Sequence, residues 1–195
     1  MTFQPFDRHQ PVASTRRNLP HRQQNGATYF VTFRLADSLP EDARIRLGEL
    51  RQLNQTDGLA WIECFLDSGT GVSLFAESKH ASLVETTLRH FDGIRYALGA
   101  FAVMPNHVHA LVQPLATHSL TKIVHGWKSY TANQLQRSAG IKGPVWQEES
   151  FDRIVRDENE LRRFHHYILS NPNNARLAPG NFISGIGSAG DFGQP

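Results

Sequence analysis

Two histidines separated by a single residue, His107 and His109, are the side chains of this sequence best placed to do chemistry together. Side chains alternate between the faces of a β-strand, so in a strand both imidazoles point to one face, about 7 Å apart. Two neutral imidazoles on one face can bind one divalent metal ion and leave coordination positions open for a substrate oxygen. An arbitrary pair of this kind is more often solvated or hydrogen-bonded to its neighbours. Phosphoryl chemistry here therefore requires a nucleophile and a third metal ligand from elsewhere in the chain.

Two tyrosines have a spacing that would supply both missing parts. Tyr130 and Tyr167 lie in segments predicted to be helical, and each is followed four residues later by a carboxamide, Gln134 or Asn171. Residues i and i+4 share a helix face, so the amide oxygen can bind the metal that faces the tyrosine's target phosphate. A phenol oxygen can attack phosphorus and hold DNA as a phosphotyrosine ester. Spacing alone leaves both tyrosines open, and either ring could simply pack its helix on a sheet.

The neighbours of the two tyrosines differ in character. Tyr130 follows Trp127 on a helix with an apolar face, where a tyrosine can pack by default. Tyr167 follows the basic pair Arg162 and Arg163, a polar and cationic neighbourhood that suits a DNA phosphate. This difference favours Tyr167.

The elements that must position these residues follow from hydrophobic periodicity and from turn and capping residues. A strand is predicted at residues 28–36, and two tightly joined antiparallel strands are predicted at 96–104 and 107–112. Helices are predicted at 40–54, at 59–66, from a cap at Ser78 to Gly93, at 120–137, and at 158–170 between Asp157 and Asn171-Pro172. This order indicates an α+β fold, an antiparallel sheet with helices packed on it.

The chain totals set the expected boundaries of that fold. A length of 195 residues fits one domain. We expect a basic extended arm at residues 1–26, a catalytic domain at 27–177 and a flexible tail at 178–195, where Gly, Ser, Ala and Pro dominate. The polar start, the lack of a long apolar run and the single cysteine predict a protein without signal peptide or membrane span, in the cytoplasm.

Five stretches in fixed order resemble the REP-associated tyrosine transposases, IS200-like enzymes of the His-hydrophobic-His type that use one tyrosine. They are ATYFVTF at 27–33, VMPNHVHAL at 103–111, WKSYTA at 127–132, VWQ at 145–147 with FDR at 151–153, and YILSNP at 167–172. Together they span nearly the whole expected domain, and MPNHVH followed by YILSNP is specific. The usual family ending NPVxAGL reads NPNNARL at 171–177, so packing after the last helix is expected to differ.

The resemblance implies a fold, a site and a substrate. The implied fold is a ferredoxin-like antiparallel sheet flanked by helices, with Tyr167 as the nucleophile and His107, His109 and Asn171 holding Mg²⁺ or Mn²⁺. The implied partner is single-stranded hairpin DNA from a repetitive extragenic palindrome, with a short guide sequence beside the hairpin foot. The implied reaction is strand cleavage and rejoining through a 5′-phosphotyrosine. A monomer without a membrane partner is the expected working unit.

Basic side chains along the chain are candidates for DNA contacts. The formal net charge is only +2, so a DNA-binding surface must come from local clusters of Lys and Arg. The candidates are Arg16, Arg17, Arg22, Lys122, Lys128, Arg153, Arg156, Arg162 and Arg163. Each alone is more often solvated surface. If the set binds phosphates, DNA affinity is expected to fall steeply with salt.

Two other functions remain open from the sequence. One is a hairpin-binding module that no longer cuts DNA, against which the presence of His107, His109, Tyr167 and Asn171 argues. The other is a histidine phosphoesterase without a covalent tyrosine. Histidine-triad enzymes place a third histidine two residues on, where this sequence has Leu111. Cleavage of hairpin DNA with and without Mn²⁺ separates these functions.

Overall fold

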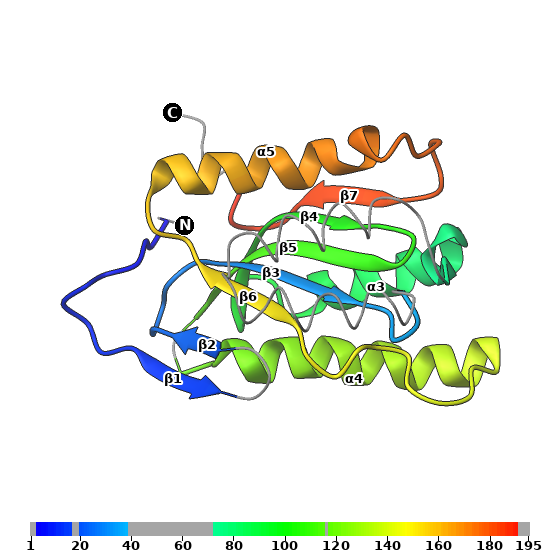
Figure 1. Ribbon diagram of the computed structural model, residues 1–195, viewed down its shortest axis with the longest axis horizontal. Helices are drawn as coiled ribbons and strands as arrows, with labels where there is room; N and C mark the ends of the chain where they lie inside the picture. The colour runs from blue at the N-terminus through cyan, green and yellow to red at the C-terminus, as the bar shows by residue number, and fades with distance from the viewer. Residues whose placement is uncertain (1–2, 17–19, 39–71, 116, 191–195) are drawn as a thin grey trace, which may run out of the picture.

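A five-stranded sheet in the order β6-β3-β5-β4-β7 forms the centre of the computed structural model, which describes residues 3–16, 20–38, 72–115 and 117–190 (Figure 1). Its strands are β3 (Tyr29–Arg34), β4 (Tyr96–Val103), β5 (His107–Pro114), β6 (Phe151–Ile154) and β7 (Ile183–Ile186), and every pairing between them is antiparallel. The α-helices of the described residues are α3 (Ser78–His90), α4 (Leu120–Ala139) and α5 (Glu158–Asn174), and a short 3-10 helix, η1 (Leu74–Ala76), precedes α3.

The connections between these elements give a ferredoxin-like topology. In chain order β3, α3, β4, β5, α4 and β6 form a β-α-β-β-α-β unit, with β3 and β5 in the middle of the sheet. The predicted α+β class with an antiparallel, ferredoxin-like sheet is therefore confirmed. The tight turn at Pro105 and Asn106 joins β4 to β5, as the sequence predicted, and the Met104 N–H donates to the His107 carbonyl at 2.8 Å.

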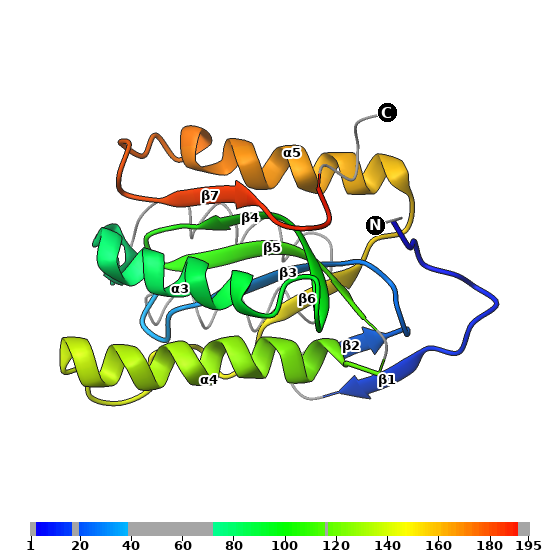
Figure 2. The ribbon, with the colours of Figure 1, turned by 180° about the vertical axis from the view of Figure 1, so that it is seen from behind.

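Alternation along the strands divides the interior into two cores, one on each face of the sheet. One core contains Val108, Ala110 and Val112 of β5 and packs against α3 and α4, which lie in front of the strands in Figure 2. The other core contains Leu111 of β5 and packs against α5. Because His107 and His109 alternate with Val108 and Ala110, both histidines face the α5 side.

The edge strands β6 and β7 were not predicted from the sequence. β7 lies where a flexible tail was expected at 178–195. It pairs with β4, where Ala100 is opposite Ile186 and Val103 is opposite Ile183. Composition misled here, since backbone pairing needs no large side chains. Glycine instead allows close approach: a Cβ on Gly187 would lie 2.6 Å from both the Leu98 Cβ and its carbonyl oxygen.

The helix ends differ from the expectation at two points. Asp157 caps α5 as predicted and accepts from the Glu160 N–H at 2.8 Å. The predicted stop at Asn171-Pro172 is wrong, because α5 continues to Asn174 with Pro172 inside it. A proline in the last turn withholds only one hydrogen bond before the helix ends. Glu77 is the residue at the cap position of α3, and Ser78 is already helical.

The N-terminal segment is more ordered than the predicted extended arm. β1 (Ala13–Arg16) and β2 (Pro20–Gln23) form a separate two-stranded sheet. His21 of β2 is hydrogen-bonded to Asp152 of β6, and the Phe6 N–H donates to the Val155 carbonyl at 2.9 Å, so the segment docks on the domain. The helices predicted at 40–54 and 59–66 lie outside the described residues. Within the described part of the chain, no helix is long and apolar enough to cross a membrane.

Candidate active site

The two histidines form a buried pair in the middle of the sheet. His107 and His109 both have 0% of their surface exposed, and their Nε2 atoms lie 2.9 Å apart. Their rings meet nearly edge to face, with centroids 4.6 Å apart. The strand therefore aims both Nε2 atoms at one point, as the spacing predicted.

Each histidine is oriented through its other ring nitrogen. The Nδ1 of His107 lies 2.7 Å from the Oδ1 of Asn106, and the Nδ1 of His109 lies 2.7 Å from the Oγ1 of Thr32. An amide oxygen only accepts, so neutral His107 carries its hydrogen on Nδ1 and has its lone pair on Nε2. Partners of this kind are those that orient metal-binding imidazoles.

Both imidazoles are kept neutral by their surroundings. Burial lowers the pKa of His109 to about 3. Burial also lowers the pKa of His107 well below its ordinary value, and electrostatic interactions with His109 and Arg34 lower it further. Neutral imidazoles retain the lone pair that metal binding needs.

Helix α5 brings Tyr167 to this pair. The Tyr167 hydroxyl lies 3.5 Å from the Nε2 of His109, and the two rings meet at 69° with centroids 5.3 Å apart. Phe30 of β3 fixes the approach, because it stacks on Phe164 of α5 at 4.4 Å and on His109 at 5.5 Å. Residues 58 positions apart in the sequence therefore meet in one site.

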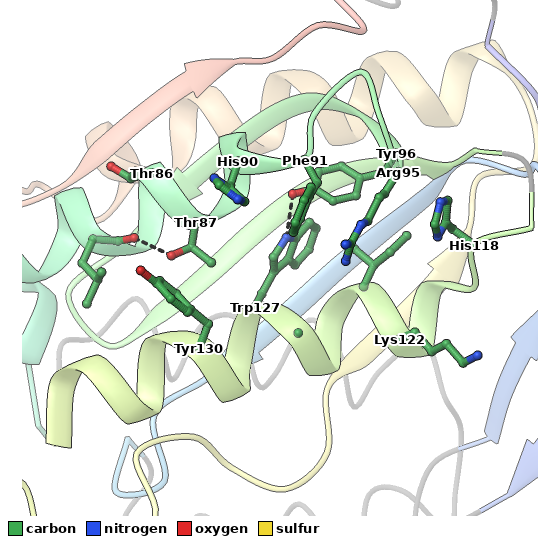
Figure 3. Close-up of a pocket in the computed structure, with 13 residues that line it drawn as sticks. Thr86, Thr87, His90, Phe91, Arg95, Tyr96, His118, Lys122, Trp127 and Tyr130 are labelled. Atoms are coloured by element: carbon green, nitrogen blue, oxygen red, sulfur yellow. Dashed lines mark hydrogen bonds between the residues drawn. The ribbon is translucent and has the colours of Figure 1, made fainter. Parts of the chain in front are cut away.

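The competing tyrosine lies on the opposite face of the sheet. Tyr130 is 52% exposed and lines a cavity of about 450 Å³ between α3 and α4. Figure 3 shows its ring beside Thr87, while Trp127 points deeper, toward the Tyr96 hydroxyl. The histidine pair does not line this cavity, so the structure brings Tyr167, and not Tyr130, to the histidines.

The third predicted metal ligand, Asn171, is fully buried on the same face of α5 as Tyr167. The amide oxygen of Asn171 would add a third metal ligand to the two imidazoles. Oxygen is a donor type that Mg²⁺ and Mn²⁺ accept. Among the described residues, no group of three or more His, Cys, Asp or Glu side chains could hold a metal ion by itself. A metal at the pair therefore depends on a ligand such as this carboxamide.

Sequence reasoning missed two residues of β3 that face the histidines. Thr32 is paired with His109 and Arg34 with His107 in the strand register, and both are buried. The signal was present in the strand TYFVTFRLA, where Thr32 and Arg34 are polar at alternate positions of an otherwise apolar segment. Such residues share a face, and this face carries the site.

The predicted DNA-binding cations fall into several groups. Arg153, Arg156 and Arg163 converge on the buried carboxylate of Glu160, whereas Arg162 lies 3.5 Å from Glu158 on the surface of α5. Lys122 is exposed at the rim of the cavity between α3 and α4, and Arg22 is exposed on β2. Arg16 lies in β1, and Arg17 lies outside the described residues.

Lys128 has a different environment from the other cations. Its ammonium donates to the carbonyls of Gln147 and Glu148, each at 2.7 Å. Burial lowers its pKa to about 8, against the opposing charges of Glu148 and Glu149. Its role in DNA binding stays a prediction, and its observed contacts fix the loop before β6.

Comparison with known proteins identifies a family and a shared fold for this chain. The family model described as "Transposase IS200 like" matches residues 74–171, half of the chain, including the histidine pair, Tyr167 and Asn171. A solved structure of a REP-associated tyrosine transposase bound to a REP hairpin is similar, with a TM-score of 0.53 and 16% identity. The match covers 85% of this chain and 76% of that one, and it shows a shared fold. No curated protein matches the chain.

Proposed function

Because this chain belongs to the IS200-like transposase family, as its sequence resemblance predicted, we propose that it is a metal-dependent single-strand DNA transposase that cuts beside a hairpin with Tyr167. One observation carries the proposal. The Tyr167 hydroxyl lies 3.5 Å from the Nε2 of His109, beside two neutral imidazoles whose Nε2 atoms converge. This is the combination of nucleophile and metal ligands that phosphoryl transfer to a tyrosine needs.

The proposed reaction exchanges one phosphodiester bond for another. The Tyr167 oxygen forms a bond to phosphorus as the bond from phosphorus to the 3′-oxygen breaks. The phenol loses a proton and the departing oxygen gains one, leaving a 5′-phosphotyrosine and a free 3′-hydroxyl. Attack by a 3′-hydroxyl on the phosphotyrosine reverses the step and joins a new strand. Packing of Phe164 on Phe30 holds the tyrosine at the required place.

The residues at the pair fit a divalent metal ion. The Nε2 atoms of His107 and His109 lie 2.9 Å apart, close enough for both to bind one ion. His107 carries its lone pair there, and His109 does so when its Nδ1–H donates to Thr32. With Asn171 as the oxygen ligand, we propose Mg²⁺ or Mn²⁺ as the ion. When bound, the ion polarises the scissile phosphate and offsets negative charge that builds in the transition state.

We propose single-stranded DNA folded into a hairpin as the substrate. The similar solved transposase is bound to a REP hairpin, which supports this partner. The cations around Glu160 supply positive charge near Tyr167 despite the low net charge of +2. Because Tyr167 reaches His109 within one chain, the site supports a monomer as the working unit.

A pair of conservative variants tests the nucleophile. We expect Tyr167→Phe to abolish the covalent protein–DNA adduct formed with a 3′-labelled hairpin oligonucleotide and Mn²⁺, while hairpin binding stays unchanged. Tyr130→Phe is the matched control, because Tyr130 lies on the other face of the sheet. The adduct is measured by its slower migration on a denaturing gel.

The same assay separates the alternatives. An adduct that persists in Tyr167→Phe and disappears in Tyr130→Phe would overturn the assignment. Hairpin binding by the native protein without any cleavage in Mn²⁺ would favour the binding module. Cleavage without an adduct would favour the histidine phosphoesterase.

A further inference from the structure

A buried carboxylate lies at the start of α5, beside the proposed nucleophile. The Glu160 side chain is 1% exposed, and it accepts from the guanidinium of Arg153 at 2.7 Å and from that of Arg156 at 2.9 Å. It also accepts from the backbone N–H of Arg156 at 2.8 Å, and an Nη2 of Arg163 lies 3.7 Å away. Burial by itself would raise the pKa of Glu160, but hydrogen bonds from Arg156 and the charge of Arg153 bring it below the ordinary value, so the group stays ionised.

Three cations around one anion leave an excess of positive charge. Three arginines and Glu160 sum to +2, and Asp157, whose charge also acts on Arg156, brings the local sum to +1. A single arginine would be enough to neutralise the carboxylate. The guanidinium groups also reach solvent, because the side chains of Arg153, Arg156 and Arg163 are 27%, 59% and 72% exposed. The cluster can therefore bind a further anion.

The cluster shares a face of the sheet with the histidine pair. Arg153 of β6 is paired with Phe30 in the strand register, and Phe30 faces α5 together with His109. Thr32, two residues along β3, is paired with His109. Arg153 and His109 therefore belong to successive cross-strand rows of one face, and such rows are about 7 Å apart along a strand.

Helix α5 aligns the same parts along its axis. Glu160, Phe164 and Tyr167 follow at spacings of four and three residues, so they occupy one face of the helix. The nucleophile is thus two turns from the carboxylate, on the side that faces the sheet. An extended DNA strand whose scissile phosphate meets Tyr167 has a neighbouring phosphate within reach of the arginines.

We propose that Arg153, Arg156 and Arg163 bind a non-scissile phosphate of the cleaved strand, and that Glu160 is a positioning residue that fixes the direction of their guanidinium groups. This inference rests on the proposed function and adds to it the site for one particular phosphate. A hydrogen-bonded carboxylate restricts the arginine rotamers before DNA arrives, so less conformational entropy is lost on binding.

Replacement of single phosphates by neutral methylphosphonates tests the site. The probe is a hairpin oligonucleotide series in which each linkage flanking the cleavage position is replaced in turn. Affinity is measured in the Tyr167→Phe background, so that binding is read without cleavage. We expect one linkage at which replacement weakens binding to Tyr167→Phe, the parent of the other variants, roughly tenfold. In Arg156→Ala the same replacement should cause a clearly smaller loss, since one of the three partners of that phosphate is already absent.

Glu160→Gln distinguishes two explanations, because they predict opposite changes in DNA affinity. It raises the net charge by one, so general electrostatic attraction predicts tighter DNA binding. The positioning role predicts weaker binding and a smaller linkage penalty, meaning a smaller loss of affinity when the same linkage is replaced. Glu158→Gln is the matched control: it makes the same charge change on a side chain that is 73% exposed, and it should keep the full linkage penalty. Circular dichroism checks that each variant is folded.

Each result decides the inference. A linkage penalty of equal size in the parent and in Arg156→Ala, or tighter binding by Glu160→Gln, overturns it while the proposed function stands. Failure of the native protein to form an adduct with any hairpin overturns the proposed function itself, and the phosphate site with it.

Discussion

At the scale of single residues, the site depends on how His109 is held. Its ring lies between Phe30, which stacks on it, and Thr32, whose hydroxyl contacts Nδ1 at 2.7 Å. Phe30 restricts the plane of the ring, the contact with Thr32 restricts its rotation, and the Thr32 hydroxyl can accept from Nδ1–H. A hydrogen on Nδ1 leaves the lone pair on Nε2, where the proposed metal ion binds. We therefore expect Thr32 to act on metal affinity without itself binding the metal.

We expect Thr32→Val to weaken Mn²⁺ binding by roughly 10–100-fold, the usual effect of losing a partner that orients a metal ligand. Valine has nearly the shape of threonine but lacks the hydroxyl, so the packing beside His109 is retained. Isothermal titration of the DNA-free protein with Mn²⁺ measures the effect. Thr87→Val is the matched control, since that hydroxyl donates within α3 to the Leu83 carbonyl at 2.7 Å. Equal Mn²⁺ affinities of Thr32→Val and the native protein would contradict this role.

The sequence could predict which candidate residues lie together but not which residues hold them in place. The spacing of His107 and His109 within a strand predicts convergent rings, and the structure confirms the convergence. The strand pattern marks Thr32 as polar, but its partner could not be predicted, because the contact with His109 depends on the β3–β5 register and spans 77 residues of sequence. The role of Glu160 could not be predicted either, since a local pattern does not reveal arginines that converge on it in three dimensions.

At the scale of elements, the edge strand β7 closes the sheet beside β4. It pairs with residues Ala100 to Val103 of β4. One face of β4 packs in the core beneath α3, and α5 covers the other face. The close approach depends on glycine. A Cβ on Gly187 would also lie 2.7 Å from an Asp92 carboxylate oxygen, and that carboxylate accepts from Ser188.

We expect Gly187→Ala to lower the free energy of unfolding by about 1–3 kcal/mol, because the added methyl meets backbone and Cβ atoms that cannot move away easily. Urea denaturation followed by circular dichroism measures the change. Gly126→Ala is the control, because a Cβ there meets nothing within 4 Å. A helical glycine replaced by alanine should gain about 0.5–1 kcal/mol. If Gly187→Ala leaves the free energy of unfolding unchanged, the result would contradict the close packing and favour the flexible tail expected from composition.

Elements with strong apolar periodicity were predictable, and those stabilised by pairing were not. β4 and β5 are buried on both faces, and the apolar runs of the sequence identified them. β6 reads Phe-Asp-Arg-Ile, and only Ile154 of it is buried. Its position as a strand depends on pairing with β3. The prolongation of α5 past Pro172 likewise depends on tertiary packing, because both Asn171 and Pro172 are buried.

At the scale of the whole molecule, the sheet separates two cationic regions. Arg156 belongs to the cluster beside α5, on the face that carries Tyr167. Lys122 lies on α4 at the rim of the cavity on the other face, and Figure 3 shows its ammonium pointing away from that cavity. A single strand bound at Tyr167 as proposed would lie beside the first region. The hairpin stem that accompanies it is the part of the substrate large enough to reach the second.

Salt dependence tests whether DNA uses both faces. The logarithm of the binding constant falls with the logarithm of salt concentration by about 0.7–0.9 per phosphate contact. For hairpin DNA we expect Arg156→Ala and Lys122→Ala each to reduce this slope by about one contact. Lys79→Ala should leave it unchanged, because that ammonium is 69% exposed and lies 2.9 Å from Glu77. With a linear strand that lacks the stem, only Arg156→Ala should reduce the slope. If Lys122→Ala leaves the hairpin slope intact, DNA is confined to the face of Tyr167, and the predicted contact at Lys122 is wrong.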